Sequence, residues 1–327
     1  MLETARGGIL RRGLAVDACD VALVTNVSAD HLGLYGIDDV TAMAEVKVVV
    51  LHAVRPGGTA VVNAHDPRLV ALAAELAVHV TYFADLDGPA DPAARATIEA
   101  VLGGGGRAVV AEGGVIVAAH GPARVALVPV AELPITFGGT ARHNVQNVLG
   151  AEAMARALDL PDVAIAAALR AFAMKDNPGR GQVIERGGIT VVLDFGHNAE
   201  GVRAVLTFVE SLRAPEGRLW VSTASPGDRT DAEIEAVAQA IHAAAPAGVY
   251  ARDLPDYLRG RAAGEVPAIF ERKLASLGLT VDRLAHAPSE LASLERAFAA
   301  AQRGDVIVVF VHLDEDPVHA FLATQPA

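Results

Sequence analysis

Cysteine is almost absent from this sequence, since Cys19 is the only one among 327 residues. A single cysteine excludes a disulfide framework and a cysteine-built zinc site within one chain. No apolar run reaches the roughly 18 residues of a membrane helix, and the first residues lack the basic stretch and apolar run of a signal peptide. We therefore expect a soluble, cytoplasmic protein.

The sequence also has fewer basic than acidic residues. Arginine and lysine together number 27 against 39 acidic residues, which gives a net charge of −12. This balance argues against nucleic acid or an anionic membrane as a partner, although a few local basic groups can still hold an anionic small substrate. Hydrophobic residues make up 52% of the chain, enough to build sizeable cores, and the length suits two domains.

The first half of the sequence alternates between two kinds of segment. Apolar runs typical of buried strands alternate with helical periods, at residues 20–26, 37–54, 59–63, 68–76 and 78–84. This order predicts a parallel sheet with helical crossovers. Leu2–Thr4 is interpreted as the end of a further strand. Residues 107–136 form short alternating stretches broken by Gly-Gly and Gly-Pro, which predicts antiparallel hairpins.

The segment Lys175–Gly181 interrupts the pattern, and we place a domain boundary there, between residues 1–176 and 177–327. Strands and helices then alternate again, at residues 190–194, 200–212, 218–223, 231–245, 288–301 and 305–311. The fold class is therefore α/β. We predict a first domain with a mostly parallel sheet and added antiparallel strands, and a smaller Rossmann-like second domain.

Polar residues that follow buried strands are the first candidates for a site, because parallel sheets bind ligands at the carboxyl ends of their strands. Glu3 offers the oxygen ligands that Mg²⁺ prefers. His31 follows the strand at 20–26 and is a second candidate metal ligand, which Asp30 would orient. The alternatives are a solvated glutamate near the terminus and a structural histidine.

Lys47 lies inside an apolar helix, where an ammonium group is costly to bury. One interpretation is that the side chain reaches solvent at the edge of the helix. The other is that the amine carries carbon dioxide as a carbamate, which turns a cation into an oxygen ligand. The sequence leaves both open.

Ordered motifs along nearly the whole chain resemble the Mur ligase family. They are ETARGGILRRGL, NVSADHLGLYGI, AEVKVVV, NAHDP, ARHNVQNVLGA, NPGRGQV, LDFGHNAEGV, GDRTDAEI and LRGRAAGEVPAI. The ETARGG, DFGHN and GDRTD forms are most similar to the cyanophycin-synthetase branch. The resemblance implies an ATP-dependent acid–amino acid ligase that forms an amide through an acyl phosphate, with ATP and Mg²⁺ as cofactors.

The resemblance also implies metal and reaction-centre residues. By this likeness Glu3 and His31 fall where the family binds Mg²⁺, and Lys47 falls at the position that is often carbamylated. His197 and Arg229 join Lys47 as catalytic candidates. Arg229 belongs to a loop that faces the reaction centre in the family.

Nucleotide-binding residues are implied in the same way. Asn144 and Asn147 match the HNxxN element that contacts the nucleotide, and Arg180 matches the arginine that reaches the ATP phosphates. Asp194 matches the aspartate on the ribose, with Asn198 beside it. The alternatives are a capped helix for Asn144, a linker turn for Arg180 and a strand-end turn for Asp194–Asn198.

One family motif is missing, because no G-x-x-x-x-G-K-[ST] phosphate-binding loop occurs anywhere in the sequence. In the family the backbone amides of this P-loop cradle the phosphates. We therefore expect an incomplete central domain that lacks the P-loop portion, and a ligase fragment that is inactive alone. The alternatives are a non-catalytic structural or regulatory subunit of an intact ligase and a nucleotide-binding remnant with hydrolase activity.

Partners follow from the same expectation. The substrate is expected to be an amino acid or a peptide, and no nucleic acid or membrane is expected to bind. Strands of buried character need covered edges and faces. We expect a homodimer or a complex with a P-loop-bearing ligase chain, contacting mainly through residues 2–14.

Overall fold

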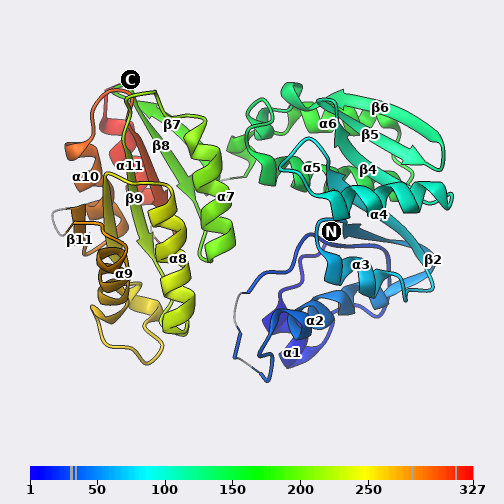
Figure 1. Ribbon diagram of the computed structural model, residues 1–327, viewed down its shortest axis with the longest axis horizontal. Coiled ribbons are helices and arrows are strands. Elements are labelled where there is room, and N and C mark those ends of the chain that lie inside the picture. The colour runs from blue at the N-terminus through cyan, green and yellow to red at the C-terminus, as the bar shows by residue number, and fades with distance from the viewer. Residues whose placement is uncertain (30–31, 34, 178, 281–282, 314, 327) are drawn as a thin grey trace. The chain divides into compact units, whose positions relative to one another are not determined.

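The structure is a computed structural model that describes residues 1–29, 32–33, 35–177, 179–280, 283–313 and 315–326. The chain divides into two compact units, residues 1–173 and 174–327 (Figure 1). No helix in the described ranges is long and apolar enough to cross a membrane.

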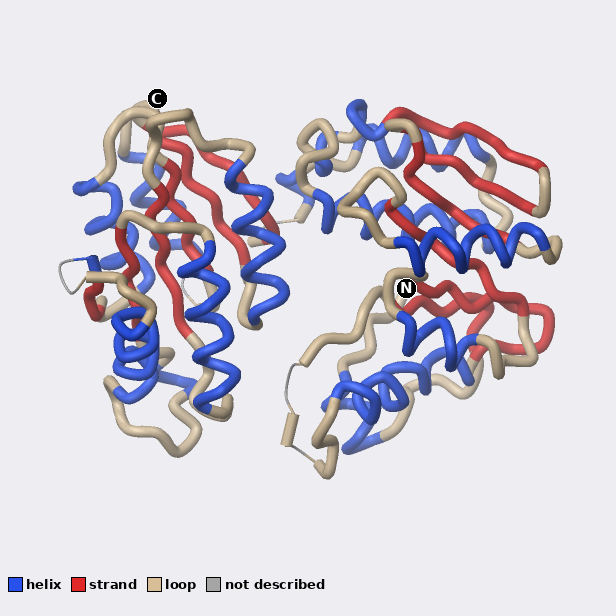
Figure 2. Tube along the Cα trace, viewed as in Figure 1, coloured by secondary structure: helices blue, strands red, loops and turns tan. Residues whose placement is uncertain are grey.

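Unit 1 is built on one six-stranded sheet (Figure 2). Its strands lie in chain order: β1 (Cys19–Val24), β2 (Val54–Asn63), β3 (His79–Asp85), β4 (Arg107–Glu112), β5 (Val115–His120) and β6 (Ala123–Pro129). The first four strands pair in parallel, and β5 and β6 are added antiparallel. This confirms the predicted parallel sheet with added hairpins.

Helices cover both faces of the unit 1 sheet. They are α1 (Arg6–Arg12), α2 (Val40–His52), α3 (Pro67–Ala73), α4 (Pro92–Gly103), α5 (Arg142–Ala157) and α6 (Asp162–Ala171), with short 3₁₀ turns η1 (Val130–Glu132) and η2 (Pro134–Thr136). Val48 of α2, Leu69 of α3 and Ile98 of α4 are buried in one core with alternate residues of the strands. Helix α5 packs on the other face. A Cβ at Gly150 would lie 3.3 Å from a methyl carbon of Leu23, so glycine there permits close approach.

Unit 2 also contains a six-stranded sheet. In spatial order its strands are β11 (Leu284–His286), β10 (Gly248–Arg252), β9 (Leu219–Ala224), β12 (Val306–Phe310), β8 (Ile189–Asp194) and β7 (Arg180–Arg186). All neighbours are parallel except β7, which runs antiparallel to β8.

The helices of unit 2 lie on both sides of its sheet, as a Rossmann-like unit requires (Figure 1). They are α7 (Ala199–Glu210), α8 (Asp231–Ala243), α9 (Glu265–Ser276), α10 (Glu290–Ala300) and α11 (Glu315–Thr324), with 3₁₀ turns η3 (Met174–Asp176) and η4 (Pro255–Tyr257). Leu294 of α10 and Val318 of α11 pack on one face with Val191 and Ile307. Helices α7 and α8 pack together, as do α8 and α9.

Three local expectations were wrong. Leu2–Thr4 forms no strand, because these exposed residues precede α1 without a neighbouring strand to pair with. The strand predicted at 59–63 begins at Val54, since Arg55–Gly58 joins the ladder through an irregular register with β1. Arg180–Arg186 forms the edge strand β7, although its first two residues belong to the segment Lys175–Gly181 that was predicted to interrupt the pattern of strands and helices.

Candidate functional site

Polar contacts join the carboxyl ends of the parallel strands in unit 1. Asn63, the last residue of β2, is buried, and its Nδ2 donates to the Thr25 carbonyl after β1 at 2.8 Å. The same amide group lies 3.1 Å from Oε1 of Gln146 in α5. The loops after β1 and β2 are therefore fixed to the first turns of α5, at the edge where parallel sheets bind ligands.

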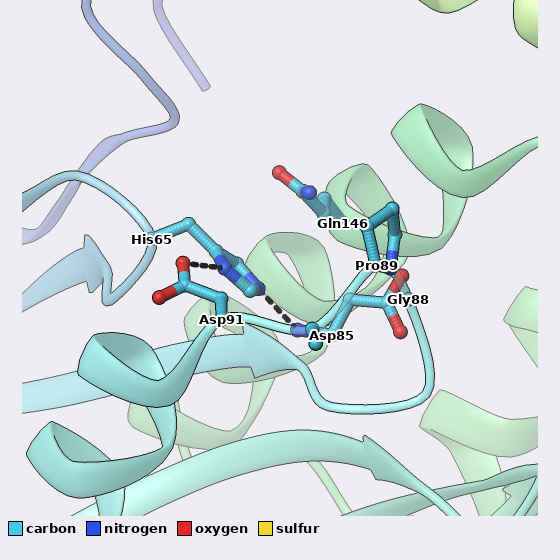
Figure 3. Close-up of a pocket in the computed structure, with 7 residues that line it drawn as sticks. His65, Asp85, Gly88, Pro89, Asp91 and Gln146 are labelled. Atoms are coloured by element: carbon cyan, nitrogen blue, oxygen red, sulfur yellow. Dashed lines mark hydrogen bonds and ion pairs between the residues drawn. The ribbon is translucent and has the colours of Figure 1, made fainter.

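A cavity of about 310 Å³ opens at this edge, lined by His65, Asp85, Gly88, Pro89, Ala90, Asp91 and Gln146 (Figure 3). His65 Nδ1 lies 2.8 Å from Asp91 Oδ2, and His65 Nε2 accepts the Asp85 backbone N–H at 3.0 Å. Because Nε2 accepts, the proton of the neutral ring lies on Nδ1. Both ring nitrogens are thus used, and His65 is a structural tie between two loops rather than a free base.

Asp85, which lines the cavity, forms an ion pair with Arg142 through both of its carboxylate oxygens. Arg142 Nε donates to Asp85 Oδ2 at 2.7 Å, and its Nη2 pairs with the other carboxylate oxygen. Burial raises the pKa of Asp85, against the opposing effect of Arg142. This pair joins the end of β3 to the start of α5. Neither this pair nor the His65–Asp91 pair was predicted from the sequence, although Asp-Pro at 66–67 and at 91–92 marks the starts of α3 and α4.

Lys47 reaches the same edge of the unit 1 sheet. It is half-buried in α2, and its Nζ donates to the Asn26 carbonyl, just after β1, at 3.2 Å. The ammonium group thus sits at the end of a parallel strand rather than in the apolar core. Its assignment as a catalytic, carbamylated residue stays a prediction.

Of the two predicted metal ligands, one lies within the described residues. Glu3 is exposed in the segment before α1, and His31 lies outside the described residues, as does Asp30. In the described ranges no three or more histidine, cysteine or acidic side chains form a group that could hold a metal.

Asn144 and Asn147 lie one turn apart near the start of α5. Asn144 is buried, and its Nδ2 donates to the Ile135 carbonyl at 3.0 Å, which ties α5 to η2. Asn147 is exposed, and its Nδ2 lies 3.3 Å from Asn144 Oδ1. Burial lowers the pKa of the adjacent His143 to about 4, so this ring is neutral at neutral pH. Of the two predicted nucleotide contacts, Asn147 is the accessible one.

Asp194 ends strand β8 in unit 2 and is 7% exposed. Its Oδ1 accepts the Gly196 backbone N–H at 2.7 Å. Burial raises the pKa of Asp194 to about 6, although the Gly196 N–H and the charge of Arg180 oppose the shift. The carboxylate is therefore ionised near neutral pH but takes up a proton in mild acid.

Arg180, His197 and Asn198 gather around the same strand end. Arg180 is the first residue of β7 and pairs with Asp194 across the antiparallel ladder, while its guanidinium lies 5.0 Å from the ring centre of Phe195. His197 contacts the same ring edge-on, with ring centres 5.3 Å apart. Asn198 caps α7 by accepting the Gly201 N–H at 2.8 Å. The structure thus brings together four of the predicted residues of unit 2.

Arg229 lies in a different loop, which follows β9. The residue is 5% exposed, and its Nη1 is 3.8 Å from Asp228 Oδ1. Arg261 Nη2 donates to the Arg229 carbonyl at 2.8 Å, and a Cβ at Gly227 would collide with the Leu258 carbonyl. The segment that contains Leu258 and Arg261 therefore holds this loop in place. The role of the loop at a reaction centre stays a prediction.

Two sequence profiles of one family match the chain. Residues 2–155 match the Mur ligase middle domain, and residues 179–311 match the domain described as Mur ligase, glutamate ligase domain. Together the two matches cover most of the chain, and each falls within one structural unit or nearly so.

Curated relatives agree with these profiles. The chain is 32% identical over 334 aligned residues to a cyanophycin synthetase of Synechocystis, covering 100% of this chain and 36% of that protein. It is 34% identical over 317 residues to a cyanophycin synthetase of Crocosphaera subtropica, covering 95% and 34%. The chain therefore spans about a third of the length of these relatives.

Solved structures share the fold. A murein peptide ligase from Psychrobacter arcticus matches with a TM-score of 0.61 at 17% identity, over 94% of this chain and 57% of that chain. A bifunctional folylpolyglutamate synthase/dihydrofolate synthase, solved with Mn, AMPPNP and L-glutamate bound, matches with a TM-score of 0.62 at 20% identity, over 94% and 62%. These identities support the fold and nothing more specific.

Proposed function

The chain belongs to the Mur ligase family of ATP-dependent ligases, and from this premise we propose that it supplies part of the nucleotide and reaction site of a carboxylate–amine ligase of the cyanophycin-synthetase type. In the proposed reaction a carboxylate takes the terminal phosphoryl group of ATP, and an amine then displaces phosphate to form an amide. The observation that carries the proposal is the gathering of Asp194, Arg180 and His197 at the end of β8. Dependence on ATP supports a cytoplasmic location.

The proposed roles in unit 2 follow from charge and burial. An ionised Asp194, held by the Gly196 N–H, accepts hydrogen bonds from the hydroxyls of a ribose. Arg180, opposite it across β7 and β8, offers a planar guanidinium to the phosphates. His197 and Arg229 are proposed to face the reacting groups, where positive charge or a hydrogen-bond donor stabilises the charge that develops on oxygen.

The proposed roles in unit 1 rest on the carboxyl edge of its sheet. Asn147 is the accessible amide for the nucleotide, and Asn144 orients it from the buried side. Lys47 places its Nζ at the end of β1. When bound, Mg²⁺ offsets the charge of the phosphates.

We propose further that this chain is inactive alone. The sequence has no P-loop, and one guanidinium cannot replace several backbone N–H groups that converge on a phosphate. The missing amides must come from a P-loop-bearing segment. Two features support such a partner: in the described residues β1 pairs only with β2, and no residue of α1 is fully buried.

Reconstitution tests the proposal. The purified chain, a P-loop-bearing Mur ligase segment and the mixture are each assayed for ADP release with an aspartate-rich peptide and arginine as substrates. The mixture should release ADP only when both substrates are present, and each component alone should not. Arg180→Ala should lower kcat/KM for ATP roughly hundredfold. Arg203→Ala, an exposed arginine on α7, is the matched control and should change it little.

Two outcomes would contradict parts of this proposal. ADP release by the chain alone that depends on Arg180 would refute inactivity. A mixture that associates but stays inactive would favour the structural or regulatory alternative. If Arg180→Ala and Arg203→Ala changed kcat/KM for ATP equally, the proposal that Arg180 contacts the phosphates would be wrong.

A further inference from the structure

Beneath the Asp194 loop lies a fully buried arginine. Arg252 ends β10, and its side chain is 1% exposed. Its Nη1 donates to Ser222 Oγ at 2.7 Å, and its Nη2 donates to Glu290 Oε1 at 2.8 Å and to the Phe310 carbonyl. A buried ion pair of this kind stabilises little by itself but fixes geometry when its remaining hydrogen bonds are satisfied.

Glu290 transmits that geometry to the loop after β12. Its carboxylate, 2% exposed, accepts the backbone N–H of His312 at 2.6 Å and that of Leu313 at 3.2 Å. The direction of the chain after Phe310 is therefore set by the buried pair. The His312 side chain is held at the same point and is 4% exposed.

The tautomer of His312 follows from its neighbour. Arg252 Nη2 lies 3.4 Å from His312 Nδ1, and a guanidinium can only donate. Nδ1 is therefore the acceptor, and Nε2 carries the proton. Burial, helped by the charge of Arg252, lowers the pKa of His312 to about 3, so the ring is neutral at working pH.

The next contact leads to the proposed nucleotide site. The rings of His312 and Phe195 meet edge-on, with centres 5.4 Å apart and planes at 62°. Phe195 also contacts the His197 ring at 5.3 Å and the Arg180 guanidinium at 5.0 Å. One aromatic ring, itself 37% exposed, thus touches two imidazoles and a cation. Its negatively polarised face attracts the guanidinium, and edge-on contacts are preferred between such rings.

We propose that Phe195 is a positioning residue for Arg180 and His197, and that His312, fixed by Arg252 and Glu290, is its rigid support. The effect of Phe195 on catalysis rests on the proposed function. The contacts of Phe195 with Arg180, His197 and His312 do not depend on it. An aliphatic residue would fill the same space without a polarised face for Arg180. An aromatic ring at position 195 is therefore required to position Arg180 and His197, and not merely to fill space.

The geometry is tested by NMR on the isolated chain with histidine labelled at Cε1. In the wild type the ring current of Phe195 should displace the His197 and His312 signals. Phe195→Leu should abolish both displacements, and Phe195→Tyr should keep them. His242, near the end of α8, is the control and should not move. Because Phe195 is exposed, Phe195→Leu should unfold at the wild-type temperature. Unchanged His197 and His312 signals in Phe195→Leu would overturn the proposal.

The consequence for the reaction is measured in the reconstituted ligase. Phe195→Leu should raise KM for ATP roughly threefold to tenfold, the range of one cation–π contact, because Arg180 loses its support. It should also lower kcat, because His197, which is proposed to stabilise developing charge, loses the same support. Phe195→Tyr should restore KM. A Phe195→Leu enzyme with wild-type KM would overturn the positioning role. If the wild-type mixture is inactive, the proposed function fails while the NMR result still decides the geometry.

Discussion

Asp194 ends strand β8 and Asp91 precedes helix α4, and their surroundings move their pKa values in opposite directions. Burial raises the pKa of Asp194, whereas the Ala94 N–H and the His65 ring lower that of Asp91. The sequence motif DFGHN identifies Asp194 as a candidate nucleotide contact, but it does not predict the pKa of this residue. That value depends on burial under the loop and on Arg180 from a strand that the sequence analysis did not predict.

Asp194→Asn should stabilise unit 2 at neutral pH while it weakens the proposed nucleotide site. The folded-state pKa of about 6 exceeds the ordinary 3.8, so ionisation costs the folded protein stability as the pH rises through about 6. Asn keeps an acceptor for the Gly196 N–H and removes that cost. The gain should be about 3 kcal/mol above about pH 7 and vanish below about pH 4. Thermal unfolding of both proteins across this range measures it.

Asp91→Asn is the matched control with the opposite sign. Its lowered pKa means that the ionised form stabilises the fold above the ordinary value, and that this stability is lost as the pH falls. This variant should therefore be less stable than the wild type at neutral pH. A pH-independent loss of stability in Asp194→Asn would contradict the assignment of Asp194.

At the scale of elements, the central strands could be predicted because each is a short apolar run between turn signals. Strand β7 could not, since its half-exposed residues are ordered by pairing with β8 rather than by their own pattern. The contacts of the residues that line the cavity could not be predicted for the same reason. His65 and Asp91 lie 26 residues apart, and Asp85 and Arg142 lie 57 apart. No local pattern records such contacts.

The Asp85–Arg142 pair gives a prediction about the join between β3 and α5. Arg142→Ala leaves a buried carboxylate, 2% exposed, without its charged partner. This should lower the free energy of unfolding of unit 1 by about 3 kcal/mol. The double variant Arg142→Ala, Asp85→Asn should recover much of the loss, because it buries no charge. Urea titrations of the three proteins measure these differences, and additive losses in the double variant would argue against the pair.

At the scale of the whole molecule, the ordered motifs predicted the family, whereas no sequence pattern predicts which surface covers α1. Ile9→Asp together with Leu10→Asp should abolish association with the P-loop-bearing segment. Ile9 and Leu10 are half-buried, so the unfolding temperature of the chain alone is measured as well and should fall by only a few degrees. Val125→Asp, at an exposed site on β6, is the control and should leave association intact. Sedimentation velocity at low micromolar concentration decides between these results.

The central claim is that this chain, joined by a P-loop-bearing segment, activates a carboxylate with ATP. An isotope measurement tests it most directly. The reconstituted mixture is given ATP, arginine and a peptide whose aspartate carboxylates carry ¹⁸O. If the carboxylate oxygen attacks the terminal phosphorus and the amine then displaces phosphate, each phosphate released with an amide must contain one ¹⁸O. Amide formation with unlabelled phosphate, or phosphate release without amide, would contradict the account.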